Sequence, residues 1–434
     1  MRVLLATDRC FLPPTDGSTR IYDAWLQALT DLGARASVLS FDHRRTRWSL
    51  AGQAEARERA SELTIVPFVG GPAEALARRA CEQMHQTATG RRHLPAALAR
   101  PWSATGQRAL TALLAERRWD AVVVQKADTA GMVGVAALRA LRARLVLDLH
   151  DNLPLRQSLT RSTVRRALIQ RTGCLLRALR PEEMADAVLP DRLTRALADE
   201  VRLLAPFDDV LFASPAERRA YEAAGLDPAR CRDWRWGFDP AESTAAASGE
   251  RAPFDLGFIG GANAFNLEAL AFLARAILPR LERRLGRPPA VLLAGGSAAA
   301  MRQLFAGRPD VLIEPWVPNL SSFYGRVGVV AVPLLSGTGV SIKTLEAARF
   351  GAAIVSTSTG LRGAALAPGR DVELADDPDR FAAVVAALAN DPARRRALGC
   401  RARVAGETGH SLDAFTRQVG ALLDGAQPGR RYAA

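Results

Sequence analysis

The sequence predicts an α/β protein made of two doubly wound units, each with a parallel sheet. Apolar runs that end in glycine or polar loops and lead into helical stretches recur along the chain, as in RVLLAT at 2–7 and VLLAGG at 291–296. A small, polar, unpatterned stretch, ESTAAASGERAP, divides these repeats and is typical of an interdomain linker. We expect a first domain at 1–241, the linker at 242–253, a second domain at 254–409 and a last helix at 410–434 that can pack back on the first domain.

The composition is that of a soluble globular protein. With 434 residues, 48% hydrophobic and 24% charged, the chain can build two cores of ordinary size. The five cysteines form no C-x-x-C pair, which argues against a disulfide framework or a structural zinc site. Met1 leads directly into an apolar strand, and no run has the length of a membrane span. We therefore expect a cytoplasmic protein, in a reducing compartment and with no structural zinc.

The net charge of +13 is spread over both halves of the chain. Aromatic residues make up only 6%, and no nucleic-acid-binding module is present, so we expect no nucleic-acid partner. Arginine has replaced almost every lysine: only Lys126 and Lys343 remain among 58 basic residues. A lysine that persists at a phosphate loop is then more readily explained by its compact ammonium group.

The first unit begins with the strand at 2–7, followed by a proline- and glycine-containing loop that holds Gly17. We predict a helix from Thr19 to Leu32, a strand at 34–41, a helix from Arg47 to Leu63 and a strand at 64–68. Gly17 therefore lies at the carboxyl end of a parallel strand, where sheets of this kind bind ligands.

The strands AVVVQ (121–125) and RLVLDLH (144–150) continue the first unit. The second ends in His150-Asp151-Asn152, again at the edge where ligands bind. A His-Asp pair there can relay protons or bind sugar hydroxyls. The alternative is a helix N-cap formed by Asp151 or Asn152 beside a histidine with no chemical role.

A basic amphipathic stretch at 156–180 has arginines between apolar residues and no acidic residue. Such a helix can lie on an anionic membrane and bring the enzyme to a lipid-linked acceptor, as a peripheral contact on the inner face of the membrane. A solvated helix face is the simpler alternative.

The second unit is organised around VVAVPLLSGTGVSIKTLEAARFGAAIVSTSTG (329–360). It predicts a strand, a glycine loop at Ser336–Gly339, a helix that ends before Gly351, and another strand. A glycine loop that opens a helix presents free N–H groups and the positive dipole end, which together form a phosphate site. Lys343 adds a full positive charge one turn into the helix, and Glu346 can accept hydrogen bonds from ribose or sugar hydroxyls.

Two commoner phosphate motifs do not fit this stretch. Ile342 occupies the position of the second glycine in G-x-x-x-x-G-K-T, and it equally spoils G-x-G-x-x-G. An ordinary βαβ turn with a surface lysine remains the alternative.

Three segments together resemble the donor domain of GT-B glycosyltransferases, closest to the family 4 (group 1) enzymes: FIGGANAFNLEAL, EPWVPNLSSFY and PLLSGTGVSIKTLEAARFGAAIVSTSTGLRG. The match covers about 255–375, whereas the first half is similar only in layout. The resemblance implies a GT-B fold, two Rossmann-like doubly wound domains facing across a cleft, with the acceptor bound by the first and the nucleotide sugar by the second.

The resemblance also assigns roles to single residues. Glu346 falls on the family's second motif glutamate, which holds the donor ribose, whereas Thr338 replaces the first. Gly261 and Asn266 occupy the region of the family's usual Arg and Lys, so Lys343 takes over the diphosphate charge. The implied catalytic set is His150, Lys343 and Glu346, with His150 near the reacting sugar. Gly17 faces the donor diphosphate, and Trp316–Val317 border the base. The implied donor-binding set is Gly17, Gly260, Gly261, Asn266, Trp316, Val317, Ser336, Gly337, Thr338, Gly339, Val340, Lys343 and Glu346.

The expected activity is a retaining, metal-independent transfer of sugar from a nucleotide-diphosphate sugar to a small-molecule, glycan or lipid-linked acceptor, as in polysaccharide biosynthesis. The donor is a co-substrate, and no cofactor is expected. A nucleotide-sugar epimerase of the same fold is one alternative. A non-catalytic nucleotide-binding partner is another, and Thr338 favours it.

Overall fold

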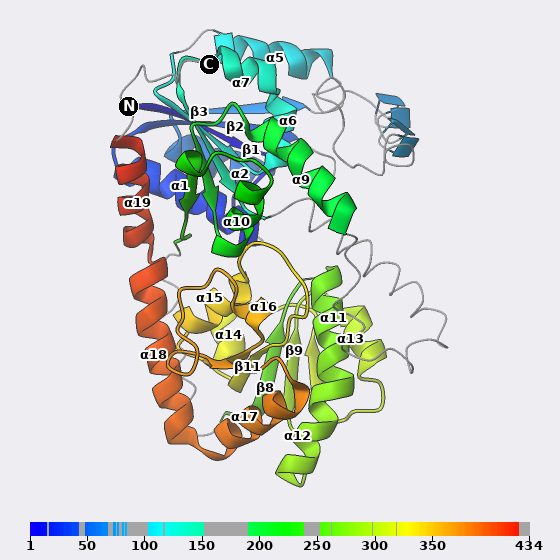
Figure 1. Ribbon diagram of the computed structural model, residues 1–434. Coiled ribbons are helices and arrows are strands. Elements are labelled where there is room, and N and C mark those ends of the chain that lie inside the picture. Colours follow the sequence, from blue (N-terminus) through cyan, green and yellow to red (C-terminus); the bar gives the residue numbers. More distant parts are fainter. Residues whose placement is uncertain are drawn as a thin grey trace. The chain divides into compact units, whose positions relative to one another are not determined.

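A computed structural model describes residues 1–14, 17–42, 48–67, 103–115, 118–151, 190–237, 252–261, 263–296, 298–317 and 319–424, with a few residues between 73 and 84. The described residues form two compact units (Figure 1). Unit 1 comprises the residues up to 151 together with 190–237 and 412–424, and unit 2 comprises 252–411. The basic stretch at 156–180 and nearly all of the predicted linker at 242–253 lie outside the described residues.

Unit 1 is built on a seven-stranded sheet in which every neighbouring pair is parallel. Across the sheet the strands are β3 (Glu62–Pro67), β2 (Arg35–Asp42), β1 (Arg2–Thr7), β4 (Ala121–Gln125), β5 (Arg144–Leu149), β6 (Asp209–Phe212) and β7 (Cys231–Asp233). Its central strands are short apolar runs that are buried along almost their whole length, as expected for a parallel sheet covered on both faces.

The helices of unit 1 connect these strands. They are α1 (Gly17–Asp31), α2 (Leu50–Arg59), α5 (Ala104–Ala115), α6 (Ala127–Val133), α7 (Val135–Ala140), α9 (Pro190–Leu204), α10 (Pro215–Ala223) and the 3₁₀ turn η2 (Pro228–Arg230). The helix predicted at 47–63 is shorter in the structure. Ala60 has extended dihedrals, and the chain then pairs with β2 from Glu62 onward, so the strand begins two residues earlier than predicted.

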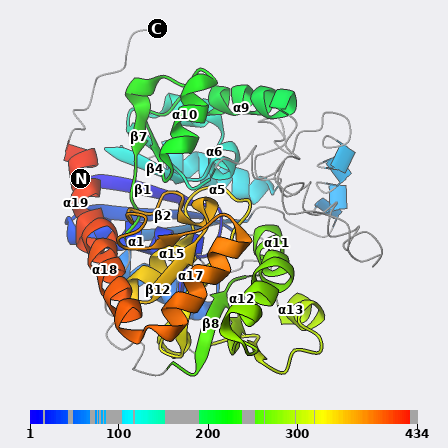
Figure 2. The ribbon, with the colours of Figure 1, turned by 60° about the horizontal axis from the view of Figure 1, so that its bottom comes forward.

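The helix α19 (Leu412–Asp424) completes unit 1 by packing on α1, as both ribbon views show (Figures 1 and 2). Phe415 makes edge contacts with Trp25 and Trp234, at ring centroid distances of 5.3 and 5.8 Å. The two tryptophans stack on each other at 5.7 Å. Three buried aromatic rings thus join the start, the middle and the end of the chain.

Unit 2 is built on a six-stranded parallel sheet. Across it lie β10 (Val311–Glu314), β9 (Val291–Ala294), β8 (Phe254–Ile259), β11 (Val327–Val332), β12 (Ala353–Ser356) and β13 (Glu373–Leu374). The helical elements are α11 (Ala264–Phe272), the π-helix η4 (Leu273–Ile277), α12 (Leu278–Leu285), α13 (Ala298–Leu304), α14 (Leu320–Tyr324), α15 (Ile342–Arg349), α16 (Ser358–Leu361), α17 (Pro378–Asn390) and α18 (Pro392–His410).

The helices of unit 2 pack in pairs: α12 contacts α17, and α15 contacts α18. The α15–α18 contact depends on glycine. A Cβ on Gly399 of α18 would stand 2.0 Å from the Gly351 carbonyl oxygen, just beyond α15. Gly351 itself has φ +64°, the left-handed conformation that ends the helix.

Both sheets reverse their winding direction at one place. In unit 1 the reversal lies between β1 and β4, and in unit 2 it lies between β8 and β11. At such a switch point the loops after the two strands diverge to opposite faces and leave a crevice at the carboxyl edge, where open α/β sheets bind ligands. The fold therefore offers one ligand-binding position in each unit.

The glycine contact between α15 and α18 gives a first prediction. Gly399→Ala should destabilise unit 2 by about 1–3 kcal/mol, because the added methyl group meets backbone that cannot move aside. Gly406→Ala, on the same helix, is the matched control: its Cβ comes no closer than 3.3 Å to any atom, the Ala348 methyl group, with backbone at 3.7 Å, and alanine favours the helix. Denaturant unfolding of both variants tests this, and equal stability of the two would contradict it.

Candidate functional site

The switch point of unit 2 brings together the loop after β8 and the helix α15. Lys343 Nζ donates a hydrogen bond of 2.5 Å to Asn266 Oδ1. The same amide donates through Nδ2 to the Gly261 carbonyl oxygen at 2.9 Å, so its orientation is fixed. Asn263 caps α11 by accepting from the Asn266 backbone N–H at 2.9 Å. The buried amide of Asn266 thus joins Lys343 to the loop after β8, although Lys343 and Asn266 are 77 residues apart in the sequence.

The Lys343 ammonium lies in a partly buried, weakly polar position, 5.2 Å from the centroid of the Phe258 ring. Burial lowers the pKa of Lys343 from 10.5 to about 8, and the negative charge of Glu346 opposes this fall. Because α15 begins at Ile342, Lys343 lies in its first turn, at the positive end of the helix dipole, rather than one turn in as the sequence suggests. A ligand anion here would restore the charged form of the ammonium.

The glycine loop at Ser336–Gly339 is held from two sides by residues that sequence reasoning did not select. Arg362 Nε donates to the Gly339 carbonyl oxygen at 2.7 Å. A Cβ on Gly337 would stand 3.3 Å from Arg362 Nη2, so the guanidinium lies directly against the loop. On the other side, the Ser336 hydroxyl donates to the buried carboxylate of Glu268 on α11.

The loops after β8 and β9 approach each other so closely that only backbone fits between them. A Cβ on Gly295, which has φ +110°, would stand 2.3 Å from the Gly260 carbonyl oxygen. A Cβ on Gly260 would stand 2.7 Å from Asn266 Nδ2. These glycines keep side chains out of the edge of the switch point and leave its backbone close to any ligand.

The structure assembles most of the predicted donor-binding residues around this position. Asn266 and Lys343 are in direct contact, Glu346 follows one turn later on α15, and Gly260 and Gly261 support Asn266. The loop residues Ser336, Gly337, Thr338, Gly339 and Val340 lie between β11 and α15.

Trp316 and Val317 follow β10, the outermost strand of this sheet, two strands from β8. The residue Trp316 is 73% exposed, which is unusual for so large an apolar side chain. It is free to stack on a flat ring.

The two predicted site residues of unit 1 lie at the carboxyl edge of its sheet. Gly17 begins α1. His150 is buried, its Nε2 lies 2.7 Å from Gln125 Oε1, and its ring packs between Tyr22 and Trp236 at centroid distances of 5.3 and 5.0 Å. Because the Gln125 oxygen can only accept, the imidazole donates through Nε2.

A carboxylate that the sequence analysis did not single out, Asp148, lies beside His150. Asp148 Oδ2 lies 3.7 Å from His150 Nε2 and accepts a hydrogen bond of 2.7 Å from Trp25 Nε1, while Oδ1 accepts one of 3.3 Å from Trp236 Nε1. Complete burial raises the pKa of Asp148 to about 7, although the two indole N–H groups favour the charged form. The sequence signal was an aspartate inside an otherwise apolar strand.

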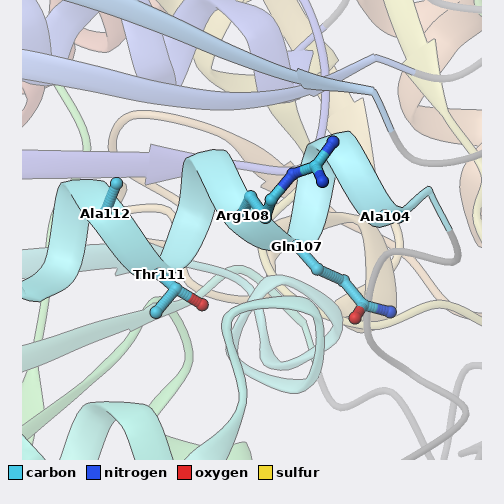
Figure 3. Close-up of a pocket in the computed structure, with 5 residues that line it drawn as sticks. All are labelled: Ala104, Gln107, Arg108, Thr111 and Ala112. Carbon is cyan, nitrogen blue, oxygen red and sulfur yellow. The ribbon is translucent and has the colours of Figure 1, made fainter.

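A hollow beside α5 is lined by Ala104, Gln107, Arg108, Thr111 and Ala112 (Figure 3). Arg108 and Gln107 point to different sides of the helix in this view. The lining holds one cation and no acid, so it offers no acid–base pair, and we do not place the site there.

Within the described part of the chain, no helix is both long and apolar enough to cross a membrane. Over the same residues, no three His, Cys, Asp or Glu side chains are grouped so that they could hold a metal ion.

The fold is shared with glycosyltransferases of known structure. HepE from Anabaena, in complex with UDP and glucose, matches with a TM-score of 0.64 and 14% identity over 98% of this chain and 100% of that one. Sucrose-phosphate synthase from Thermosynechococcus elongatus matches with a TM-score of 0.65 and 16% identity over 98% of both chains. A glycosyltransferase from Rickettsia africae gives 0.62 and 9%, again over 98% of both. A search of curated protein sequences finds no significant match.

These likenesses, at low identity, establish the class of fold: two Rossmann-like doubly wound units of the GT-B type, as the sequence predicts. The activity follows from the sequence itself, because residues 253–391 match the family described as glycosyl transferases group 1. This match lies within unit 2 and, together with the shared fold, identifies the protein as a glycosyltransferase.

The buried Asp148 gives a second prediction. Its pKa is about 7 in the folded protein and 3.8 ordinarily, so between these values the folded state keeps a proton that the unfolded state releases. The contribution of this group to stability is therefore complete below pH 3.8 and falls as the pH rises to about 7. Asparagine cannot ionise, so Asp148→Asn should not show this decrease in stability with rising pH.

Urea unfolding at several pH values between 4 and 8 measures the effect. The stability of the variant relative to wild type should improve with pH by a few kcal/mol. Asp413→Asn, an exposed acid on α19, is the control. A difference between Asp148→Asn and wild type that does not change with pH would show that Asp148 is ionised throughout.

Proposed function

We propose that the chain transfers a sugar from a nucleotide-diphosphate sugar to an acceptor hydroxyl with retention of anomeric configuration and without a metal ion or cofactor, as a family 4 enzyme. The observation that supports this most strongly is the Lys343–Asn266 hydrogen bond across the switch point of unit 2, beside the glycine loop. It holds a cation, a helix start and loop amides at the place where a doubly wound sheet binds a nucleotide.

The breaking glycosidic bond transfers negative charge to the diphosphate, and that charge must be stabilised. In the proposal, Lys343 and the amides at the start of α15 supply this stabilisation as fixed dipoles and a fixed charge. Arg362 and Glu268 hold the loop in place from opposite sides. The leaving phosphate helps to deprotonate the acceptor on the same face, which gives retention, and His150 borders the reacting sugar.

Donor recognition divides between the two ends of the nucleotide. Glu346 accepts hydrogen bonds from the ribose, and the exposed Trp316 with Val317 borders the base. The Anabaena HepE structures contain UDP and UDP-glucose, so a uridine nucleotide is the first donor class to test. The proposed product is a glycan, a glycolipid or a glycosylated metabolite.

A non-catalytic nucleotide-binding protein is the second candidate, because Thr338 stands where the family has its first motif glutamate. In that case the nucleotide would bind without sugar transfer to any acceptor of a panel. An epimerase would instead convert the sugar of the donor when no acceptor is present.

A thermal-shift screen with UDP, GDP, ADP and dTDP sugars tests the proposal directly. A ligand present at 100 times its Kd stabilises the folded state by about 2.7 kcal/mol, so the true donor should stand out. If none of these nucleotides raises the melting temperature, the proposed donor site is wrong.

The third prediction concerns Lys343. Lys343→Ala should lower kcat/KM by about 2–4 kcal/mol of transition-state stabilisation, because the ammonium meets charge that develops as the bond breaks. Arg284→Ala removes an exposed cation on α12 and serves as the control that should leave turnover unchanged. Wild-type turnover in Lys343→Ala would remove this residue from the mechanism.

The lowered pKa of Lys343 gives the fourth prediction. Above pH 8 the free site holds an uncharged amine, and an anionic ligand must bring a proton with it. Nucleotide affinity should therefore fall by up to about tenfold per pH unit above pH 8. Lys343→Arg stays charged throughout, so its affinity should be flat over the same range. Equal pH profiles for the two proteins would contradict the assignment.

A further inference from the structure

A second cation lies at the switch point of unit 1, and the donor site does not use it. The winding of this sheet reverses between β1 and β4. Asp8 directly follows β1, and Lys126 directly follows β4, so the two side chains come from the two loops that flank the crevice. They form an ion pair with Lys126 Nζ 3.7 Å from Asp8 Oδ2.

The backbone of Lys126 is strained. Its φ is +70°, and no other non-glycine residue in the described ranges has a positive φ. A conformation of this kind costs about 1–3 kcal/mol and persists where surrounding structure imposes it, frequently at ligand sites. Here the Lys126 N–H donates to the Asp148 carbonyl oxygen at 2.9 Å, which extends the β4–β5 pairing past the end of β4. This backbone conformation fixes the direction in which the side chain of Lys126, one of only two lysines in the chain, leaves the main chain.

The side chain of Lys126 is largely buried, and no described residue accepts a hydrogen bond from it. The residue is 7% exposed, and among the described residues its ammonium donates no hydrogen bond. Asp8 instead accepts from the Tyr22 hydroxyl at 2.6 Å and from Arg9 Nε at 3.2 Å. An ammonium group has three N–H donors, and burying them unfilled is unfavourable.

The charges of the described residues around the crevice do not cancel. Arg9 and Lys126 carry two positive charges against the single negative charge of Asp8. Burial alone would raise the pKa of Asp8. The charges of Lys126 and Arg9, with the hydrogen bonds from Tyr22 and Arg9, outweigh burial and hold this pKa well below its ordinary value. Burial raises the pKa of Asp148 to about 7, although the charge of Lys126 opposes this rise, so near pH 7 that carboxyl offsets only part of the surplus. Of the described residues, Tyr22 lies 5.5 Å from the ammonium, and His150 packs on Tyr22.

We propose that Lys126 binds an anionic oxygen group, a phosphate or a carboxylate, carried by the acceptor. The unfilled N–H donors then gain charged acceptors, and the group brings the negative charge that the cluster lacks. Asp8 and Tyr22 hold the ammonium in position. That the anion belongs to the acceptor rests on the proposed function, whereas the anion site itself is argued only from residues of unit 1.

The scarcity of lysine allows each site to be observed separately. Protein labelled with ¹³C at the lysine ε-carbon gives only two side-chain signals, one from Lys126 in unit 1 and one from Lys343 in unit 2. Lys126→Arg and Lys343→Arg assign them. Titration with inorganic phosphate, with acetate and with chloride at equal ionic strength then compares the two anion classes with simple screening.

We expect the Lys126 signal to shift and saturate with phosphate or with acetate, and the stronger of the two identifies the class. The shift should persist in Lys343→Ala and in Arg57→Ala, which removes an exposed cation on α2. A Lys126 signal that responds to phosphate and acetate no more than to chloride would overturn the proposal.

The Lys343 signal keeps this test apart from the proposed function. If Lys343 fails to respond to nucleotide sugars while Lys126 responds to anions, the donor assignment fails and the anion site stands. With an active donor, Lys126→Ala should raise KM at least tenfold for an acidic acceptor and leave KM unchanged for its uncharged analogue. Equal effects on both acceptors would show that Lys126 has only a structural role.

Discussion

The constraint on which the rest of this structure depends is the common direction of the strands in each sheet. Because every strand runs the same way, all the loops that follow strands gather at one edge. Where the winding reverses, two neighbouring loops turn to opposite faces and leave a crevice. The hydrogen bond from Lys343 to Asn266 spans this crevice in unit 2, and the Asp8–Lys126 pair spans it in unit 1.

The order and type of most elements could be predicted from the sequence. Short apolar runs such as 121–125 and 329–332 are long enough only for buried strands, and glycines such as Gly351 mark helix ends through their backbone conformation. The boundary at Arg59 could not be predicted, because tertiary pairing with β2 starts the next strand early. The order of strands across each sheet depends on long-range pairing that no local pattern encodes.

The candidate site was predictable where the chemistry was local. The glycine loop, Lys343 and Glu346 lie within one short stretch, and Asn266 followed from a second motif. Glu268 and Arg362 were missed because they reach the loop from elements distant in sequence, and nothing in their own neighbourhoods distinguishes them from solvated charges. The strained backbone conformation of Lys126 could not be predicted from the sequence either, although Lys126 was noted there as one of only two lysines.

The packing of α19 on α1 has a consequence for synthesis of the chain. Trp25 is made early, Trp234 midway and Phe415 only near the end, yet the three rings form one buried cluster. On the ribosome, where chains emerge from the N-terminus, unit 1 cannot close its aromatic cluster until after all of unit 2 has been translated. During that interval Trp25 and Trp234 lack the edge contacts that Phe415 makes in the finished protein.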